Sequence, residues 1–174
     1  MRKTKKLTLS AMLVALGTAL MVIGSVVEVL DLTVCAAASL IVVFVYLELR
    51  SYYPWLVWLC TSLTTALLYS GSVVWIEYLC VFGVYPILKA YIERLPRWSW
   101  ILVKLAFINA VIWVIFCIAE LLFGIPFFDT EGTLMTVALY LLMNIAFVAY
   151  DMFITVMVRL YYDKFRTRFK RFLK

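Results

Sequence analysis

Long runs of apolar residues alternate along the chain with short polar breaks, and this pattern predicts its elements. Charged residues, glycine and proline mark the breaks, as at Arg94, Pro96 and Arg97 or at Gly124 and Pro126. The runs between them approach the ~20 residues that a helix needs to cross a bilayer. They predict six membrane-spanning helices, at residues 7–30, 32–49, 55–69, 73–90, 98–123 and 133–159.

Composition supports this interpretation and leaves little room for anything else. Hydrophobic residues make up 67% of the 174 positions and the mean hydropathy is +1.05, whereas soluble domains are about 45–50% apolar. We therefore expect an all-α integral membrane protein. A six-transmembrane-helix bundle would form a single domain over residues 1–163, followed by a basic amphipathic cytoplasmic tail at 164–174.

Two features near the ends have alternative interpretations. A basic start before an apolar run also occurs in signal peptides, but this run is too long and lacks a small-residue cleavage site, so we expect it to remain as a helix. The tail spaces Phe165, Phe169 and Phe172 among lysines and arginines, which suits a helix lying on anionic lipids. Nucleic-acid binding would use the same charge, but the chain has no room for a folded binding module.

The distribution of charge orients the predicted bundle. All sixteen lysines and arginines fall on one side of it, at the two ends of the chain and at the intervening breaks. By the positive-inside rule both termini are then cytoplasmic. The opposite side carries only acidic charges, at Glu28, Asp31, Glu77, Glu120, Asp129 and Glu131.

The sequence contains none of the common catalytic or metal-binding motifs considered below. It has no histidine, which excludes histidine-based nucleophilic triads, H-E-x-x-H zinc sites and haem held by histidine. Its four cysteines lie in separate apolar runs without a C-x-x-C pair. No phosphate-binding lysine loop and no G-x-S-x-G are present, and the acidic residues form no D-x-x-D-G metal cluster. We expect no catalytic residue, metal or cofactor, and any energy input would come from a partner or an ion gradient.

Small residues form two strips on the first predicted helix. Residues four apart stack on one helical face, and small residues let another helix approach closely. The first strip has a four-residue spacing and consists of Ala11, Ala15 and Ala19; the second has a seven-residue spacing and consists of Ser10, Gly17 and Gly24. Two interpretations are open: both strips pack the bundle internally, or the alanine strip faces a partner protein.

Two charged residues lie within predicted spans. Lys104 and Asp151 are seven to eight residues from the same ends of consecutive antiparallel helices, hence roughly 10–12 Å deep at ~1.5 Å per residue. Because an isolated charge at such depth is unfavourable, we predict that they form an ion pair or share a polar cavity. The alternative is that Lys104 extends alone to the inner headgroups.

Polar and aromatic residues in the outer halves of the spans predict a binding site. Asn109, Trp113 and Glu120 share one face of the fifth span, and Tyr140 and Asn144 share a face of the sixth. Trp75, Glu77, Tyr78 and Glu28 are the residues that could complete this pocket. Without a nearby lysine or arginine it favours a neutral or cationic, ring-containing ligand. Alternatively, Asn109 and Asn144 only join two helices, while Trp75 and Tyr78 belong to the interfacial aromatic belt.

Taken together, the six short spans, the cytoplasmic ends and the Ala11-Ala15-Ala19 helix resemble the S components of energy-coupling factor (ECF) transporters of bacteria. The resemblance implies a non-enzymatic, substrate-binding subunit for a vitamin or other micronutrient in the cytoplasmic membrane. It also implies that the alanine strip contacts a transmembrane T component, which is driven by two ATPase subunits. The alternative from another class is a structural membrane protein resembling the bacterial cell-shape protein MreD.

Overall fold

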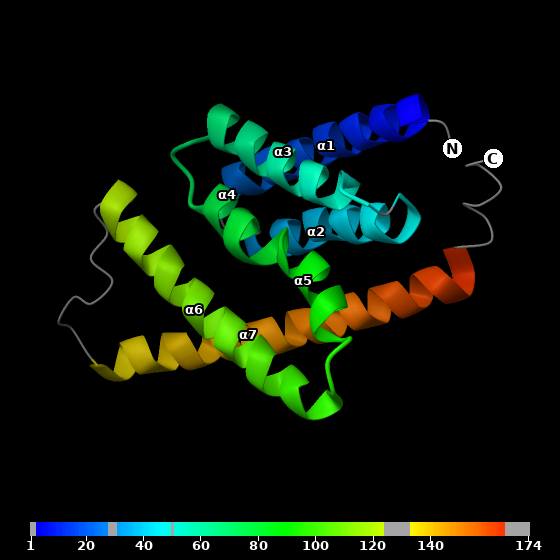
Figure 1. The fold of residues 1–174 in the computed structure, drawn as a ribbon. Coiled ribbons are helices and arrows are strands. Elements are labelled where there is room, and N and C mark those ends of the chain that lie inside the picture. Colours follow the sequence, from blue (N-terminus) through cyan, green and yellow to red (C-terminus); the bar gives the residue numbers. More distant parts are fainter. Residues whose placement is uncertain (1–2, 28–30, 50, 124–132, 166–174) are drawn as a thin grey trace. The chain divides into compact units, whose positions relative to one another are not determined.

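The computed structural model describes residues 3–27, 31–49, 51–123 and 133–165. All regular structure in these ranges is helical (Figure 1). In chain order the elements are α1 (Lys3–Val26), α2 (Asp31–Glu48), α3 (Tyr53–Leu68), α4 (Val74–Glu77), η2 (Tyr78–Phe82), α5 (Tyr85–Ile92), α6 (Arg97–Phe123), α7 (Thr133–Leu160) and η3 (Tyr161–Phe165), where η denotes a π-helical segment.

Helix length and apolarity agree with a membrane protein. In the described part of the chain, 5 segments are long and apolar enough to cross a bilayer: Lys3–Val26, Asp31–Glu48, Val74–Ile92, Trp98–Ile118 and Thr136–Lys164. The all-helical class is thus confirmed. The remaining predicted span corresponds to α3, which has 16 residues and so extends about 24 Å at ~1.5 Å per residue, less than the ~30 Å of a typical hydrocarbon core.

Contacts divide the chain into two compact units, which are described separately below. The first unit comprises residues 1–89 and 154–174, and the second comprises residues 90–153. Helix α7 therefore begins in the second unit and ends in the first.

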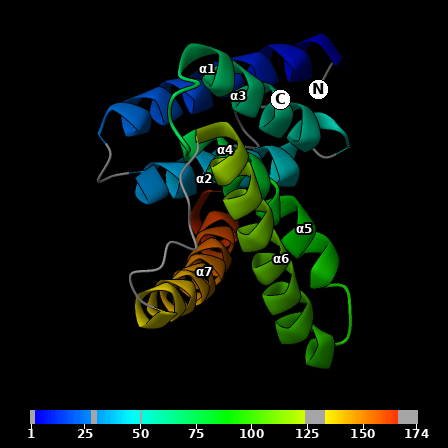
Figure 2. The ribbon, with the colours of Figure 1, turned by 90° about the vertical axis from the view of Figure 1, so that its left-hand side faces the viewer.

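In the first unit α1, α2 and α3 pack side by side (Figure 2). The second small-residue strip makes this packing possible, because Ser10, Gly17 and Gly24 are all buried. A Cβ atom on Gly17 would lie 3.1 Å from a Thr61 methyl group, and one on Gly24 would lie 2.9 Å from Val34. A side chain at position 24 would therefore require Val34 or α1 to shift, and one at position 17 would crowd Thr61.

Most hydroxyl groups in this packed region are satisfied by their own helix. Ser25 donates to the Met21 carbonyl at 2.9 Å, Ser62 to that of Trp58 at 2.8 Å, and Thr65 to that of Thr61 at 2.8 Å. A polar group buried without a partner is costly, and bonding to the preceding turn removes that cost without a second helix. Close approach at Gly17 and Gly24 therefore contributes to this interface beside the Thr18–Thr64 hydroxyl contact between α1 and α3.

The two ends of the first unit differ in charge. Lys6, near the start of α1, donates to the Leu49 carbonyl at 3.4 Å and lies 5.7 Å from the Tyr53 ring centroid. We call this end, which also carries the exposed Lys3 and Lys5, the basic end. At the opposite end, the start of α2 meets α4, where Cys35 Sγ lies 3.8 Å from the Val74 carbonyl.

The fourth predicted span is interrupted rather than continuous. Gly83 N–H donates to the Tyr78 carbonyl at 2.7 Å, five residues back, which is the bond of a π-helix. Pro86 follows at the start of α5, where its missing N–H is tolerated. Trp58 Nε1 then donates to the Leu79 carbonyl at 3.1 Å, the acceptor that Gly83 would have used in an α-helix.

The second unit is formed by α6 and the first part of α7. The side chains of Ile108, Ile112, Phe147 and Tyr150 are buried. The rings of Phe107 and Phe147 lie 6.4 Å apart, which is within the range of favourable aromatic contacts. Alongside this apolar interface the unit carries the polar contacts considered next.

Candidate functional site

The residues predicted to line the pocket fall into both units, and each group is described within its own unit. Trp75, Glu77 and Tyr78 belong to the first unit. Tyr78 is 1% exposed and packs in an apolar cluster with Met21, Cys35 and Val42, so it is a core residue. Trp75 and Glu77 are partly buried. Glu28 lies outside the described residues.

Two polar atoms of α4 are buried without a partner. Among the residues that the structure describes, neither Trp75 Nε1 nor Glu77 Oε2 makes a hydrogen bond. The Asp31 carboxylate is close enough to interact electrostatically with Glu77. Because native proteins leave few buried polar atoms unsatisfied, such groups call for an explanation. This end of the first unit therefore offers an indole donor and a carboxylate acceptor.

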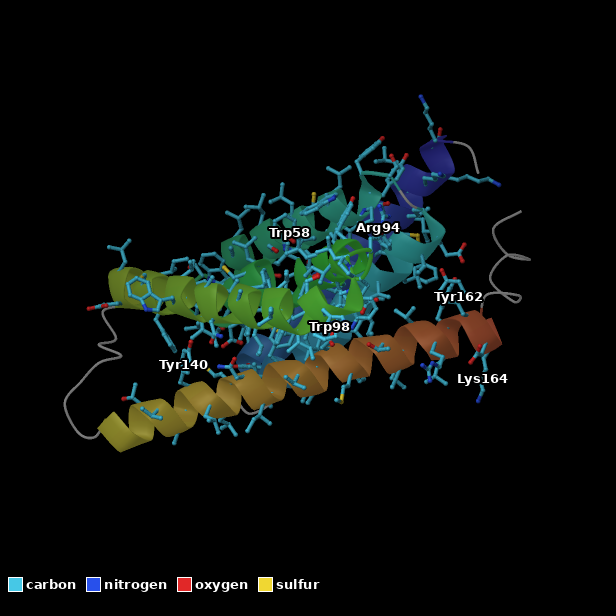
Figure 3. The ribbon with its side chains drawn as sticks, turned by 60° about the horizontal axis from the view of Figure 1, so that its bottom comes forward. Trp58, Arg94, Trp98, Tyr140, Tyr162 and Lys164 are labelled. Carbon is cyan, nitrogen blue, oxygen red and sulfur yellow. The ribbon has the colours of Figure 1, made fainter. Side chains whose placement is uncertain are left out.

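In the second unit three of the predicted pocket residues bond to one another. The Tyr140 hydroxyl donates to Asn109 Oδ1, and Asn144 Nδ2 donates to the same oxygen at 3.3 Å. Figure 3 shows Tyr140 pointing from α7 toward α6. Asn109 Nδ2 donates to the Leu105 carbonyl at 2.8 Å, and Asn144 Nδ2 also reaches the Tyr140 carbonyl at 3.0 Å. This network joins α6 to α7. The amide and hydroxyl groups that were predicted to bind a ligand are here bonded to one another.

The other two predicted residues of α6 do not join this network. Trp113 is 63% exposed and Glu120 is also exposed. Both therefore lie on a surface of the helix that is open to lipid, to solvent or to another protein.

The two charged residues predicted to pair are in contact within the second unit. Lys104 Nζ donates to both carboxylate oxygens of Asp151, at 2.8 and 3.0 Å. The exposed fractions are 13% for the lysine side chain and 20% for the aspartate. Glu93 lies 3.5 Å from the same ammonium group, and the Trp100 ring centroid lies 5.9 Å away. Two carboxylates and an aromatic face thus surround one lysine.

On α1 the alanine strip faces away from the packed interface. Ala11, Ala15 and Ala19 are exposed and line an open groove of about 660 Å³ between α1 and α3. Thr18 and Thr64, whose hydroxyl groups are 2.7 Å apart, join the two helices along this groove. The lining is otherwise apolar, with Leu68 and Ile23 among its side chains.

Several polar contacts in the first unit were not predicted from the sequence. Lys89, which is 5% exposed, donates to Thr155 Oγ1 at 2.8 Å and joins α5 to α7. The Tyr161 hydroxyl donates to Glu48 and joins η3 to α2, and Trp58 donates to Leu79. A lysine inside an apolar run is a signal that could have drawn attention to Lys89, whereas the other two contacts have no local signal.

These features define a class of protein: a helical, multi-pass membrane protein. Comparison with protein-family models, with curated proteins and with solved structures finds no match. A more specific assignment therefore depends on the geometry described above.

Proposed function

We propose that this chain is the substrate-binding subunit of an ECF-type micronutrient transporter, docking on a T component through the alanine strip. The observation that carries the proposal is the division of labour on α1. The glycine-containing strip packs α1 internally, while Ala11, Ala15 and Ala19 are exposed beside an open apolar groove. Because lipid gives apolar helices no reason to associate, an exposed small-residue surface in a bilayer suits close packing against another protein's helix.

The ligand in this proposal is a small ring-containing nutrient that is bound and not chemically changed. The unsatisfied Trp75 indole and Glu77 carboxylate support a ligand that has both an acceptor and a donor. A cationic ligand would also relieve the repulsion between Glu77 and Asp31. Energy would come from two ATPase subunits bound to the T component, and the chain would act in the bacterial cytoplasmic membrane.

The proposed topology has six crossings and cytoplasmic termini. The course of α3 supports it, because Tyr53 lies at the basic end of the first unit and Val74 lies at the opposite end. Residues 53–74 must therefore traverse the unit, although α3 itself is short.

The alternative is a structural protein of a larger membrane assembly, similar to the cell-shape protein MreD. The network of Asn109, Tyr140 and Asn144 favours it, since these side chains satisfy one another between α6 and α7. Such a protein would use small-residue surfaces for assembly but would carry no ligand.

The test is co-purification of the full-length chain with a T component and its two ATPases after co-expression. We expect Ala15→Trp to reduce recovery of the T component at least tenfold, because the indole fills the groove. Leu16→Trp is the matched control, since Leu16 is the next residue, is exposed and does not line the groove. Thermal unfolding in detergent should be the same for both variants.

Two results would count against the transporter. If the wild-type chain recovers no T component, or if both variants recover it equally, the alanine strip is not a docking surface. If mass spectrometry also finds no small molecule released from the purified chain, the scaffold alternative is favoured.

A further inference from the structure

A second groove lies between α2 and the end of α7, both within the first unit. It has a volume of about 200 Å³ and is lined on one side by Leu40, Val43, Phe44 and Leu47, and on the other by Met157, Leu160 and Tyr161. Apart from the Tyr161 hydroxyl group, these side chains are apolar. That hydroxyl donates to Glu48, one residue beyond the groove on α2.

The shape of the groove restricts what it can hold. The α2 wall has the spacing i, i+3, i+4, i+7, and the wall formed by residues 157, 160 and 161 has the spacing i, i+3, i+4. Each wall is therefore a stripe along its helix. From Leu40 to Leu47 the chain rises by seven steps of ~1.5 Å, so the α2 wall is roughly 10 Å long. The volume is below the ~300–1,000 Å³ of typical small-molecule pockets. A narrow apolar slot along two membrane helices suits a single hydrocarbon chain.

An exposed lysine follows the α7 wall of this slot along the chain. Lys164 is four residues after Leu160, in the π-helical segment η3 that continues the chain beyond the α7 wall of the groove. It is exposed, and Figure 3 shows it at the end of the α7 ribbon. It has no ion-pair partner among the residues that the structure describes. Asp163, three residues after Leu160, is exposed as well.

This mouth lies at the basic end of the first unit. Glu48, which receives the Tyr161 hydrogen bond, is adjacent to Leu49, whose carbonyl accepts from Lys6. Lys3 and Lys5 are exposed at the same end. A ligand with its tail in the slot therefore has its head at an end where the lysines (Lys3, Lys5, Lys6 and Lys164) outnumber the carboxylates of Glu48 and Asp163.

We propose that this groove binds one acyl chain of an anionic phospholipid, with Lys164 paired to the lipid phosphate. The slot supplies apolar contact along the chain, and the lysine selects for negative charge at the headgroup. The Tyr161–Glu48 hydrogen bond closes α7 onto α2 beside the bound chain. This inference is independent of the transport function, because it involves neither the alanine strip nor the residues of α4.

The test measures lipid retention by native mass spectrometry of the full-length protein, delipidated and then mixed with phosphatidylglycerol or phosphatidylcholine. We expect the wild type to bind one phosphatidylglycerol in preference to phosphatidylcholine. Lys164→Gln should reduce this preference about fivefold, which corresponds to the ~1 kcal/mol that a basic residue contributes at an anionic surface. Arg159→Gln is the control, since it removes the same charge from an exposed position off the groove face.

A second pair of variants tests the slot itself. Met157→Trp should reduce retention of both lipids at least tenfold because the indole occupies the groove. Val156→Trp should have no effect, since Val156 is the neighbouring residue and is 52% exposed outside the groove. Circular dichroism of all four variants establishes that they are folded.

Equal retention of the two lipids by the wild type would overturn the proposal. So would lipid retention by Lys164→Gln and Met157→Trp that equals retention by their controls, Arg159→Gln and Val156→Trp. Either result would mean that lipid contacts this face without a specific site.

Discussion

At the scale of single residues, the charged pair of α6 and α7 illustrates how a membrane protein tolerates ions. The side chains of Lys104 and Asp151 are mostly buried, and they form an ion pair at 2.8 Å. Each offsets the cost of the other's charge, and removal of Lys104 leaves the Asp151 carboxylate without its 2.8 Å ion-pair partner in a poorly solvated place. Glu93 at 3.5 Å and the nearby Trp100 ring hold the ammonium group in position.

We expect Lys104→Met to lower the free energy of unfolding by about 3–5 kcal/mol, the usual cost of orphaning one member of a buried pair. Asp151→Asn in the Lys104→Met background should recover much of that loss. The measurement is a double-mutant cycle followed by denaturant titration in detergent. Leu102→Ala is the control, because Leu102 is on the same helix and is 71% exposed. Additive effects of the two charge substitutions would show that the pair contributes no coupling energy.

At the scale of elements, the break in the fourth predicted span depends on a neighbour. The π-helical turn leaves the Leu79 carbonyl without its usual donor, and Trp58 of α3 supplies one at 3.1 Å. Gly83 makes room for the same ring, since a Cβ atom there would be 2.3 Å from Trp58 Cδ1. The interruption is therefore a packed feature of the first unit and not a local weakness of the helix.

We expect Trp58→Phe to lower the free energy of unfolding by about 1–3 kcal/mol, since it retains most of the apolar contact but leaves a carbonyl unsatisfied. Chemical denaturation in detergent would measure it. Trp98→Phe serves as the control, because the Trp98 side chain is 94% exposed. Equal effects of the two substitutions on the free energy of unfolding would mean that the Trp58 hydrogen bond does not stabilise the π-helical turn.

At the scale of the whole molecule, the number of crossings decides on which sides the termini lie. If α3 crosses, the spans number six and both ends share a side; if only the five long segments cross, the ends lie on opposite sides. The contacts of Tyr53 with Lys6 and of Cys35 with Val74 favour a crossing.

A cysteine at either end of α3 distinguishes these topologies. We expect Gly71→Cys, in the exposed turn after α3, to react with a membrane-impermeant maleimide in intact cells. Ser51→Cys, before α3, should react only after permeabilisation, and the unsubstituted protein provides the background. Labelling of both positions from the same side would exclude α3 as a span.

The sequence was sufficient for the class of the protein and for its helices, because these follow from local properties. Apolar runs of bilayer length determine where helices form, and the depth of Lys104 and Asp151 within two such runs was enough to predict their contact. The pocket was less predictable. Periodicity places Asn109 and Tyr140 on helix faces, but it does not say whether those faces meet a ligand or each other.

Which surfaces meet was decided only by the tertiary structure. Both small-residue strips lie on α1 and have the same local character, yet one packs against Thr61 and Val34 while the other remains exposed. The groove beside Tyr161 depends on a contact between residues 113 positions apart. Transfer of a segment into the bilayer is a sum over consecutive residues, so the sequence determines it. Helix pairing depends on shape complementarity between distant segments, and only the folded chain brings those shapes together.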